Sequence, residues 1–422
     1  MDFLDHYEAP LNPCSVETLP EPMEMRDGKW VWPVMTSCYE LQEDKSRRDG
    51  RMDLFLVEQQ PQQREMRLGT PVATIESSSN HNNNDDNEDD DVSGGVLDGK
   101  WFPKTRIDGN MEYSRFATAR SSGQVFIHTV RFDTPLPRLN LWAVSKPLHN
   151  QDDDDDQQSS PLCLSLNWHP TGHKIVSSYS NGRIAIHDIV VSSNDENNTN
   201  GGDSGGDGAQ LVLQDSWLAH TLFGNTPTEV WSAAFVGGNN DCRLWVASGG
   251  DDGKLKLWDA NQQQQQPIFT LCFEAGVTVI SPHPRIPHLF ACGSYDETVA
   301  LYDTRYMTTT TKTSSSKIAV GGGVWRLQWH PNCNNKLLVA AMHGGCRVLR
   351  IDNIFHDECQ ESDNDQEEQQ QTTMVIEKEF TKHQSMAYGA DWLVDGNNNN
   401  DTAVSCSFYD RAVYMWDANC IQ

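Results

Sequence analysis

Three residues in the second half of the chain have side chains suited to proton transfer or to the binding of negative charge. His343 lies in Met-His-Gly-Gly, where a neutral imidazole can accept a proton near physiological pH. Arg326 follows Val-Trp, and its guanidinium can hold a carboxylate or an oxyanion. Asp391, in Tyr-Gly-Ala-Asp-Trp, is a carboxylate that can act as a base. We take these three residues as the candidate catalytic residues.

Structural roles remain open for the same residues. His343 can be an exposed turn residue, and Arg326 can pair with a neighbouring element of the fold. The sequence shows no G-x-S-x-G, G-x-x-x-x-G-K-[ST] or H-E-x-x-H motif, and no G-x-G-x-x-G follows a strand-like stretch. Short motifs therefore do not decide between catalysis and structure.

A second group of residues can bind a cationic substrate. Trp231, Trp325 and Tyr388 have aromatic faces that attract cations, although such residues also serve as packing. Acids and tyrosines at strand starts or in tight turns complete the candidate substrate-binding set: Glu229, Tyr295, Asp296, Tyr409 and Asp410. The carboxylates among them would attract the same cation.

Repeated segments must position these residues. The clearest runs from Glu229 to Asp259 and contains three short strand-like stretches, the last of which alternates apolar and polar residues with a period of two. Asp252-Gly253 is a hairpin turn signal between the second and third stretches. The pattern recurs in segments 162–188, 276–303, 324–351 and 388–417, and more faintly in 100–129 and before residue 57.

The spacing of the repeats predicts the fold. The segments close at residues 57, 129, 188, 259, 303, 351 and 417. Without the acidic insertions the steps are about 44 to 52 residues, close to one four-stranded propeller blade. We therefore predict an all-β chain, residues 1–422, that forms a single seven-bladed WD-repeat β-propeller. The last copy lacks an outer strand, and we expect Phe3 to Tyr7 to supply it and close the ring.

Some repeat residues have predicted structural roles. Trp258, Tyr302 and Trp416 should wedge between neighbouring blades. Asp252, His220 and Ser248 should form a buried hydrogen-bonded relay. We expect this relay in one copy alone, because Cys292 and Cys406 take the place of the serine in the equivalent positions of two other copies.

The charge balance excludes several classes of partner. Lys and Arg number 32 against 60 Asp and Glu, which gives a net charge of −28. That balance argues against nucleic acid and against an anionic membrane surface, and no apolar run is long enough to cross a bilayer. The scattered cysteines and the acidic, proline-containing N-terminal region favour a cytoplasmic protein, for which we expect a monomer without metal or cofactor.

Four polar, acidic stretches interrupt the repeats: 77–98, 150–160, 192–210 and 355–374. We predict disordered loop insertions there, because such segments bury too little apolar surface to offset the entropy of ordering. The alternative is that they act as an electrostatic arm for a basic partner.

Several strings in the blades are more specific than the general repeat. They are Gly-Gly-Val-Trp-Arg at 322–326, Tyr-Gly-Ala-Asp-Trp at 388–392 and Ser-Phe-Tyr-Asp at 407–410. In these strings the chain resembles the WD-repeat family of diphthine methyl ester hydrolases from about Leu162 to Trp416. The acidic insertions depart from the family pattern.

The resemblance implies a reaction and a partner. The reaction is hydrolysis of the methyl ester of diphthine, a modified histidine of elongation factor 2, to give diphthine and methanol in diphthamide biosynthesis. The partner is elongation factor 2 carrying methylated diphthine, whose trimethylammonium the aromatic residues would cage. The alternative is a noncatalytic WD-repeat scaffold, since a propeller alone does not name a function.

Overall fold

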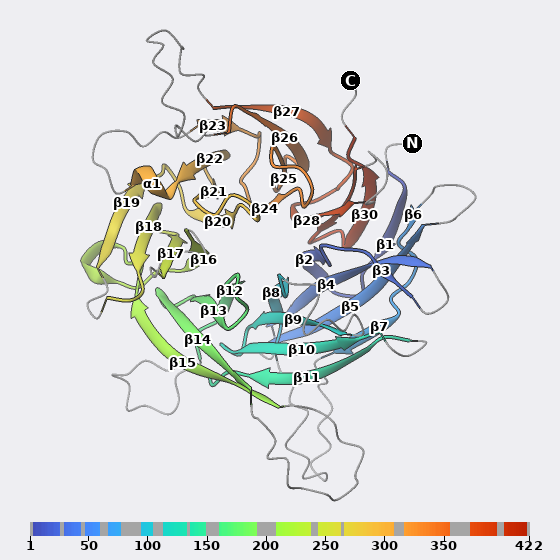
Figure 1. Ribbon diagram of the computed structural model, residues 1–422, viewed down its shortest axis with the longest axis horizontal. Helices are drawn as coiled ribbons and strands as arrows, with labels where there is room; N and C mark the ends of the chain where they lie inside the picture. The colour runs from blue at the N-terminus through green and yellow to red at the C-terminus, as the bar shows by residue number, and fades with distance from the viewer. Residues whose placement is uncertain are drawn as a thin grey trace, which may run out of the picture.

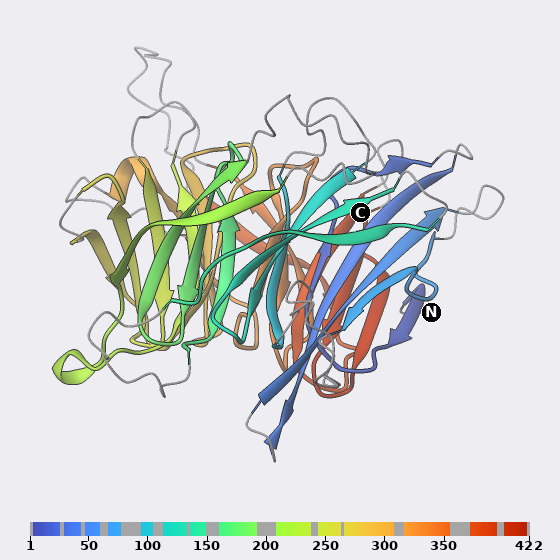
Figure 2. The ribbon, with the colours of Figure 1, turned by 90° about the horizontal axis from the view of Figure 1, so that it is seen from below.

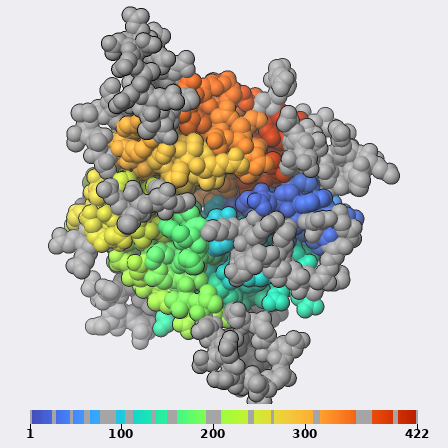
Figure 3. Space-filling view, in the orientation of Figure 1, coloured from blue at the N-terminus to red at the C-terminus, as the bar shows by residue number. Residues whose placement is uncertain are grey.

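Seven antiparallel sheets surround a central channel in the computed structural model of the protein (Figure 1). The structure describes residues 3–25, 29–43, 47–59, 66–76, 94–103, 113–132, 136–148, 160–191, 208–237, 244–262, 266–307, 316–354, 372–394 and 401–419. The sheets follow one another around the ring in chain order, so the blue N-terminal and red C-terminal parts of the surface meet on one side (Figure 3). The chain is thus a seven-bladed β-propeller, as the repeat spacing predicts.

In each blade the strands follow one another from the channel outward. The first contains β2 (Asn12–Thr18), β4 (Trp30–Gln42) and β5 (Arg47–Gln59), with β6 (Met66–Arg67) and β7 (Ala73–Glu76) outside β5 and β3 (Met23–Glu24) on β4. The second contains β8 (Val96–Trp101), β9 (Tyr113–Arg120), β10 (Val125–Arg131) and β11 (Arg138–Val144). The third contains β12 (Cys163–Trp168), β13 (Lys174–Tyr179), β14 (Arg183–Val191) and β15 (Ala209–Leu218).

The remaining blades repeat this order. The fourth contains β16 (Val230–Val236), β17 (Trp245–Gly250), β18 (Lys254–Asp259) and β19 (Pro267–Cys272), and the fifth β20 (Val277–Pro282), β21 (Leu289–Ser294), β22 (Thr298–Asp303) and β23 (Ser316–Ala319). The sixth contains β24 (Arg326–Trp329), β25 (Lys336–Ala340), β26 (Cys346–Asp352) and β27 (Thr373–Phe380). A short helix, α1 (Thr304–Met307), follows β22, and a 3-10 turn, η3 (Phe223–Asn225), follows β15.

The two ends of the chain share the seventh blade. β28 (Ala387–Val394), β29 (Asp401–Ser407) and β30 (Ala412–Asp417) form its inner three strands, and β1 (Asp5–Glu8) pairs antiparallel with β30. Figure 2 shows β1 beside the red C-terminal strands. The predicted closure by the N-terminal segment is confirmed, and it leaves the last blade with no missing strand.

The predicted closing residues all lie in third strands. Residue 57 is in β5, 129 in β10, 188 in β14 and 351 in β26, while 259, 303 and 417 end β18, β22 and β30. The predicted wedges also pack between blades. Trp258 contacts the third-blade cluster, Tyr302 that of the fourth blade and Trp416 that of the sixth.

The fourth blade holds the predicted relay. His220 lies 2.7 Å from Asp252 Oδ1 and 2.8 Å from Ser248 Oγ, which also accepts the Trp258 indole N–H at 2.8 Å. The side chains of His220, Ser248 and Asp252 are buried, so the relay satisfies polar groups that water cannot reach.

The expectation that Cys406 replaces the relay serine in the last blade is wrong by one residue. The register of β28 and β29 places Ser405, not Cys406, at the position of Ser248. Ser405 Oγ lies 2.7 Å from His383 Nε2 and accepts the Trp416 N–H at 3.1 Å. A second blade thus has the histidine, serine and tryptophan of the relay, so the relay is not confined to one copy.

Three of the four predicted disordered insertions extend too far at their C-terminal ends. Residues 77–93, 150–159, 192–207 and 355–371 lie outside the described residues. The stretches 77–98, 192–210 and 355–374 run into β8, β15 and β27, which begin at Val96, Ala209 and Thr373. Asp98, the last residue of the first stretch, is therefore a buried strand residue and not part of a disordered loop. Among the described residues, no helix is long and apolar enough to span a bilayer.

Candidate functional site

The innermost strand of nearly every blade carries a bulge near its start. The pairing with the second strand skips one residue in β2, β8, β12, β16, β20 and β28, namely Cys14, Leu97, Leu164, Trp231, Thr278 and Tyr388. Trp325 stands at the same place, just before β24. A bulge re-aims side chains, so these residues and those that follow in alternation form stacked rings around the channel.

Polar residues after the bulge join three of the inner strands to the next one along the ring. Ser165 Oγ accepts the Ala233 N–H at 3.3 Å, and Ser232 Oγ accepts the Ile280 N–H at 3.1 Å. Asp98 Oδ2 accepts the Leu166 N–H at 3.3 Å. The inner strands have a free edge toward the channel, and these side chains satisfy its backbone donors.

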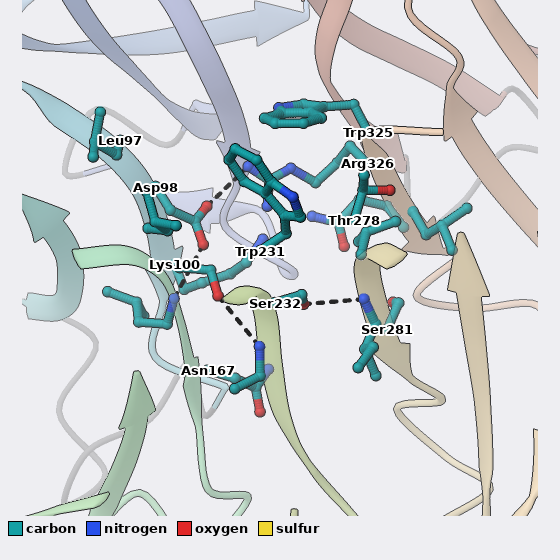
Figure 4. Close-up of a pocket in the computed structure, with 18 of the residues that line it drawn as sticks. Leu97, Asp98, Lys100, Asn167, Trp231, Ser232, Thr278, Ser281, Trp325 and Arg326 are labelled. Atoms are coloured by element: carbon teal, nitrogen blue, oxygen red, sulfur yellow. Dashed lines mark hydrogen bonds and ion pairs between the residues drawn. The ribbon is translucent and has the colours of Figure 1, made fainter. Parts of the chain in front are cut away.

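A cavity of about 170 Å³ lies within the ring. Its walls come from β8, β12, β16, β20 and β24 and the residues that precede them, and include Asp98, Lys100, Asn167, Ser232, Thr278 and Arg326. Trp231 and Trp325 also line it, and Figure 4 shows both indoles beside the Arg326 side chain. The cavity is polar in its interior and aromatic on one side, which suits a small polar group attached to a cation.

Arg326 reaches across the channel. Its guanidinium Nη2 lies 2.9 Å from Asp98 Oδ1, which joins the sixth blade to the second (Figure 4). Arg326 is 8% exposed and Asp98 is 2% exposed. Burial alone would lower the pKa of Arg326, but Asp98 and Glu17 raise the pKa above its ordinary value, so the guanidinium stays charged.

A second row of polar contacts runs beside the Arg326–Asp98 pair. Glu17, on β2, pairs with Lys100 on β8, and its other oxygen accepts the Gln328 amide N–H at 3.0 Å. Both lines therefore run from β24 to β8. Because strand order around the ring places β12, β16 and β20 on one side and β2 and β28 on the other, these side chains divide the channel.

Asp391 lies on the side of the divided channel opposite the cavity. Its Oδ2 accepts the Thr18 N–H at 2.7 Å, and its Oδ1 accepts the Trp392 N–H at 2.8 Å. Burial and the negative charge of Glu17 raise the pKa of Asp391 to about 8, despite these hydrogen bonds. Burial likewise raises the pKa of Glu17, although Lys100 and Arg326 oppose the rise. Asp391 thus changes charge near neutral pH, as a general base requires.

An aromatic rim, formed by Trp231, Tyr295, Trp325 and Tyr388, lies along the fourth to seventh blades at one mouth of the channel. The Trp325 ring lies 5.6 Å from Trp231, 5.9 Å from Tyr295 and 4.9 Å from Tyr388. Tyr388 contacts Phe408, which contacts Tyr409 at 4.9 Å. Four of the predicted substrate-binding aromatics therefore meet in one cluster, and Tyr409 adjoins it with 64% of its surface exposed.

The predicted acids of the rim take different positions. Glu229 is half-buried at the start of β16 and accepts the Thr228 hydroxyl at 3.2 Å. Asp296 accepts N–H and O–H bonds from Thr298 within its own turn, and Asp410 accepts the Gln384 N–H at 2.8 Å. The last two therefore have turn-stabilising contacts as well as proximity to the rim.

The three candidate catalytic residues are not brought together. Arg326 lines the cavity, and Asp391 lies behind the dividing line. His343 is exposed in the turn between β25 and β26 and is not part of the cavity wall. Within the described ranges, no group of three or more His, Cys, Asp and Glu side chains is arranged to hold a metal ion.

Sequence reasoning missed several residues of the site. Four residues that the sequence did not single out form the charged and amide contacts across the channel: Glu17, Asp98, Lys100 and Gln328. One signal was available for three of them. Glu17, Lys100 and Gln328 stand three residues after the bulge position, as Asp391 does in its own blade.

Comparison with known proteins identifies the family. The family described as "WD domain, G-beta repeat" matches residues 216–259, which include most of the fourth blade. A "Diphthine methyltransferase homolog" of Dictyostelium discoideum is 31% identical over 336 residues, which cover 77% of this chain and 76% of the relative. The chain belongs to the diphthine methyltransferase family.

Other members of the family support this assignment. The diphthine methyltransferase of Schizosaccharomyces pombe is 28% identical over 332 residues, 76% of this chain and 78% of that protein. The human diphthine methyltransferase is 35% identical over 243 residues, and the match covers 55% of this chain and 44% of the human protein. Trp325 and Tyr388, which belong to the strings that indicated the family, form the centre of this member's aromatic rim.

Proposed function

We propose that this protein hydrolyses the methyl ester of diphthine methyl ester on elongation factor 2, giving diphthine and methanol. The observation that carries the proposal is a polar cavity that is lined by Arg326 and adjoins an aromatic rim. Asp391, a carboxyl group with a pKa of about 8, lies behind Glu17 and Gln328. Ester hydrolysis at neutral pH needs such a base, a donor for the oxyanion and a place for the substrate.

The substrate's cationic end binds at the rim. A trimethylammonium group cannot donate hydrogen bonds, so aromatic faces and nearby carboxylates are its natural partners. Trp231, Trp325 and Tyr388 supply the faces, with Tyr295 closing the cluster and Glu229 nearby. With the cation at the rim, the ester carbonyl enters the cavity and its oxygen meets Arg326.

The chemical step takes place at the dividing line. Asp391, in its carboxylate form, takes the proton of a water molecule in the cavity by way of the Glu17 carboxyl group, which contacts the cavity residues Lys100 and Gln328 and interacts with Asp391. The hydroxide adds to the ester carbonyl, and Arg326 stabilises the oxyanion. Collapse breaks the bond to methoxide, which takes the proton from Asp391 and leaves as methanol. The product is the carboxylic acid, which loses its proton to solvent and becomes the carboxylate.

His343 is left out of this mechanism. Its exposed turn lies outside the cavity wall, whereas Asp391 interacts electrostatically with Glu17 and with the cavity residue Lys100. A loss of turnover in His343→Ala together with normal turnover in Asp391→Asn would move the base to that turn.

The test is mass spectrometry of the modified histidine. Elongation factor 2 carrying methylated diphthine is incubated with the purified protein, and the expected result is loss of one CH2 unit in mass. The name of the relatives describes methyl transfer, so diphthine-carrying factor with a methyl donor forms the second arm. Gain of a methyl group there would replace hydrolysis by transfer. No change in either arm, with stable binding of the factor, would favour the noncatalytic scaffold.

A further inference from the structure

The Arg326 guanidinium has a donor that no described residue uses. Nη2 faces Asp98, but the buried Nε has no hydrogen-bond acceptor within the described part of the chain. A buried donor without a partner costs free energy, and Arg326 lines the cavity. The arrangement is therefore ready for an oxygen atom of a ligand.

An arginine in this position attracts carboxylates more strongly than esters. A carboxylate forms charge-assisted bonds with a guanidinium, whereas an ester carbonyl is uncharged. If Arg326 acted alone, it would hold the acid formed by hydrolysis in preference to the ester. The reaction would then be limited by its own product.

Asp98 changes this balance. Asp98 neutralises Arg326 at 2.9 Å, and Glu17 neutralises Lys100 on the parallel line. An uncharged ester adds no charge to these balanced pairs. A carboxylate adds a negative charge next to Asp98 and Glu17 in a buried site, where an unpaired charge is expensive.

We propose that Asp98 is a specificity-determining residue that makes the cavity accept an uncharged carboxyl derivative and reject the free carboxylate. The inference rests on the proposed function for the identity of the ligands. After hydrolysis the new carboxylate competes with Asp98 for Arg326, and the return of Arg326 to Asp98 expels the product. Asp98 acts through Arg326 and touches no reacting atom.

The test compares two small ligands by calorimetry. Glycine betaine carries the trimethylammonium group and a free carboxylate. Its N-methyl amide keeps the cation but replaces the carboxylate with an uncharged amide, which mimics the ester and is not consumed. The wild-type protein is expected to bind the amide at least about tenfold more tightly than the acid. In Asp98→Asn that preference should vanish or reverse, because Arg326 is then an uncompensated cation.

Two further variants separate this role from a structural one. Asp98→Glu restores the charge and should restore the preference for the amide. Glu379→Gln removes one negative charge from the outer strand β27, far from Arg326, and should leave the preference unchanged. Thermal unfolding of each variant establishes that it is folded before binding is measured.

The outcomes are distinct. A folded Asp98→Asn protein with the wild-type preference overturns the inference, as does a wild-type protein that binds neither ligand or prefers the acid. Should Asp98→Asn not fold, the same comparison in Asp98→Glu and in Arg326→Lys decides. The lysine keeps the charge without the guanidinium geometry and should weaken the preference. Because binding needs no turnover, the preference can hold even if the elongation-factor assay shows no hydrolysis.

Discussion

Arg326 and Asp98 lie on inner strands three blades apart in a ring of seven, and their side chains meet at 2.9 Å in the middle of the channel. No other spacing on this ring places two blades farther apart. Both residues are almost fully buried, so the pair is both a crosslink between opposite walls and a barrier between the cavity and Asp391. The channel is thus divided by charged side chains and is not an open bore.

The pH dependence of turnover follows from Asp391. Because its pKa is raised to about 8, most of the protein holds Asp391 protonated at neutral pH. We expect kcat/KM to rise with pH and to level off above about pH 8. Asp391→Asn should reduce kcat by about 100-fold or more and abolish that limb. A variant with normal kcat and an unchanged profile would exclude Asp391 as the base.

Glu17 should control the pH range over which kcat/KM rises. Its negative charge is the second cause, after burial, of the raised pKa of Asp391. Glu17→Gln removes the charge and leaves Lys100 without its partner, and both effects favour ionised Asp391. The limb should move to lower pH in this variant. A limb that stays in place, in a folded protein, would show that the two carboxyl groups do not interact.

The repeat pattern was enough to predict the ring but not the site. Closing residues such as Asp259 and Asp303 recur because each blade needs the same third strand, so local alternation and spacing fix the architecture. The pair Arg326–Asp98 has no such local cause, since it depends on which blades face each other across the channel. Asp98 also follows a run of acidic residues in the sequence. Its burial in the folded protein distinguishes it from them, and the sequence does not show that burial.

The repeat explains why the predicted rim aromatics lie together. Trp231, Trp325 and Tyr388 stand at corresponding bulge positions, so a comparison of copies selects them together. His343 stands at a turn position, where sequence cannot tell a side chain that points to the mouth from one in solvent. Ser405 escapes a comparison of copies because it precedes its turn acid, Asp410, by five residues, whereas Ser248 precedes Asp252 by four.

The rim should recognise charge as well as shape. Trp325 lies at the centre of the aromatic cluster, and a cation–π contact is worth about 1 to 2 kcal/mol. Trp325→Leu should therefore raise the Kd of a trimethylammonium ligand by about 5- to 30-fold. A ligand with a tert-butyl group in place of the trimethylammonium is the control, and its weaker binding should change much less. Equal losses for both ligands would indicate packing instead of cation binding.

The relay of the fourth blade should contribute to stability and not to turnover. His220 is buried between Asp252 and Ser248, and the Trp258 indole donates to the same serine. Asp252→Ala leaves the histidine without its acceptor and should lower the free energy of unfolding by about 1 to 3 kcal/mol. Chemical denaturation measures the change. A variant as stable as the wild type would refute this role.

Asp391 should also make folding stability depend on pH in an unusual direction. A carboxyl group whose folded-state pKa is about 8, against about 4 when unfolded, holds a proton in the folded state that the unfolded chain has already lost. Its contribution to stability is therefore complete below about pH 4 and is lost as the pH rises toward and through 8. Asp391→Asn removes this dependence. The substitution also weakens two backbone hydrogen bonds, which changes the free energy of unfolding by the same amount at every pH. The stability of the variant relative to wild type should therefore improve from about pH 5 to pH 8. Urea unfolding at both pH values measures the two differences, and a constant difference would mean that Asp391 ionises in the folded protein as it does in the unfolded chain.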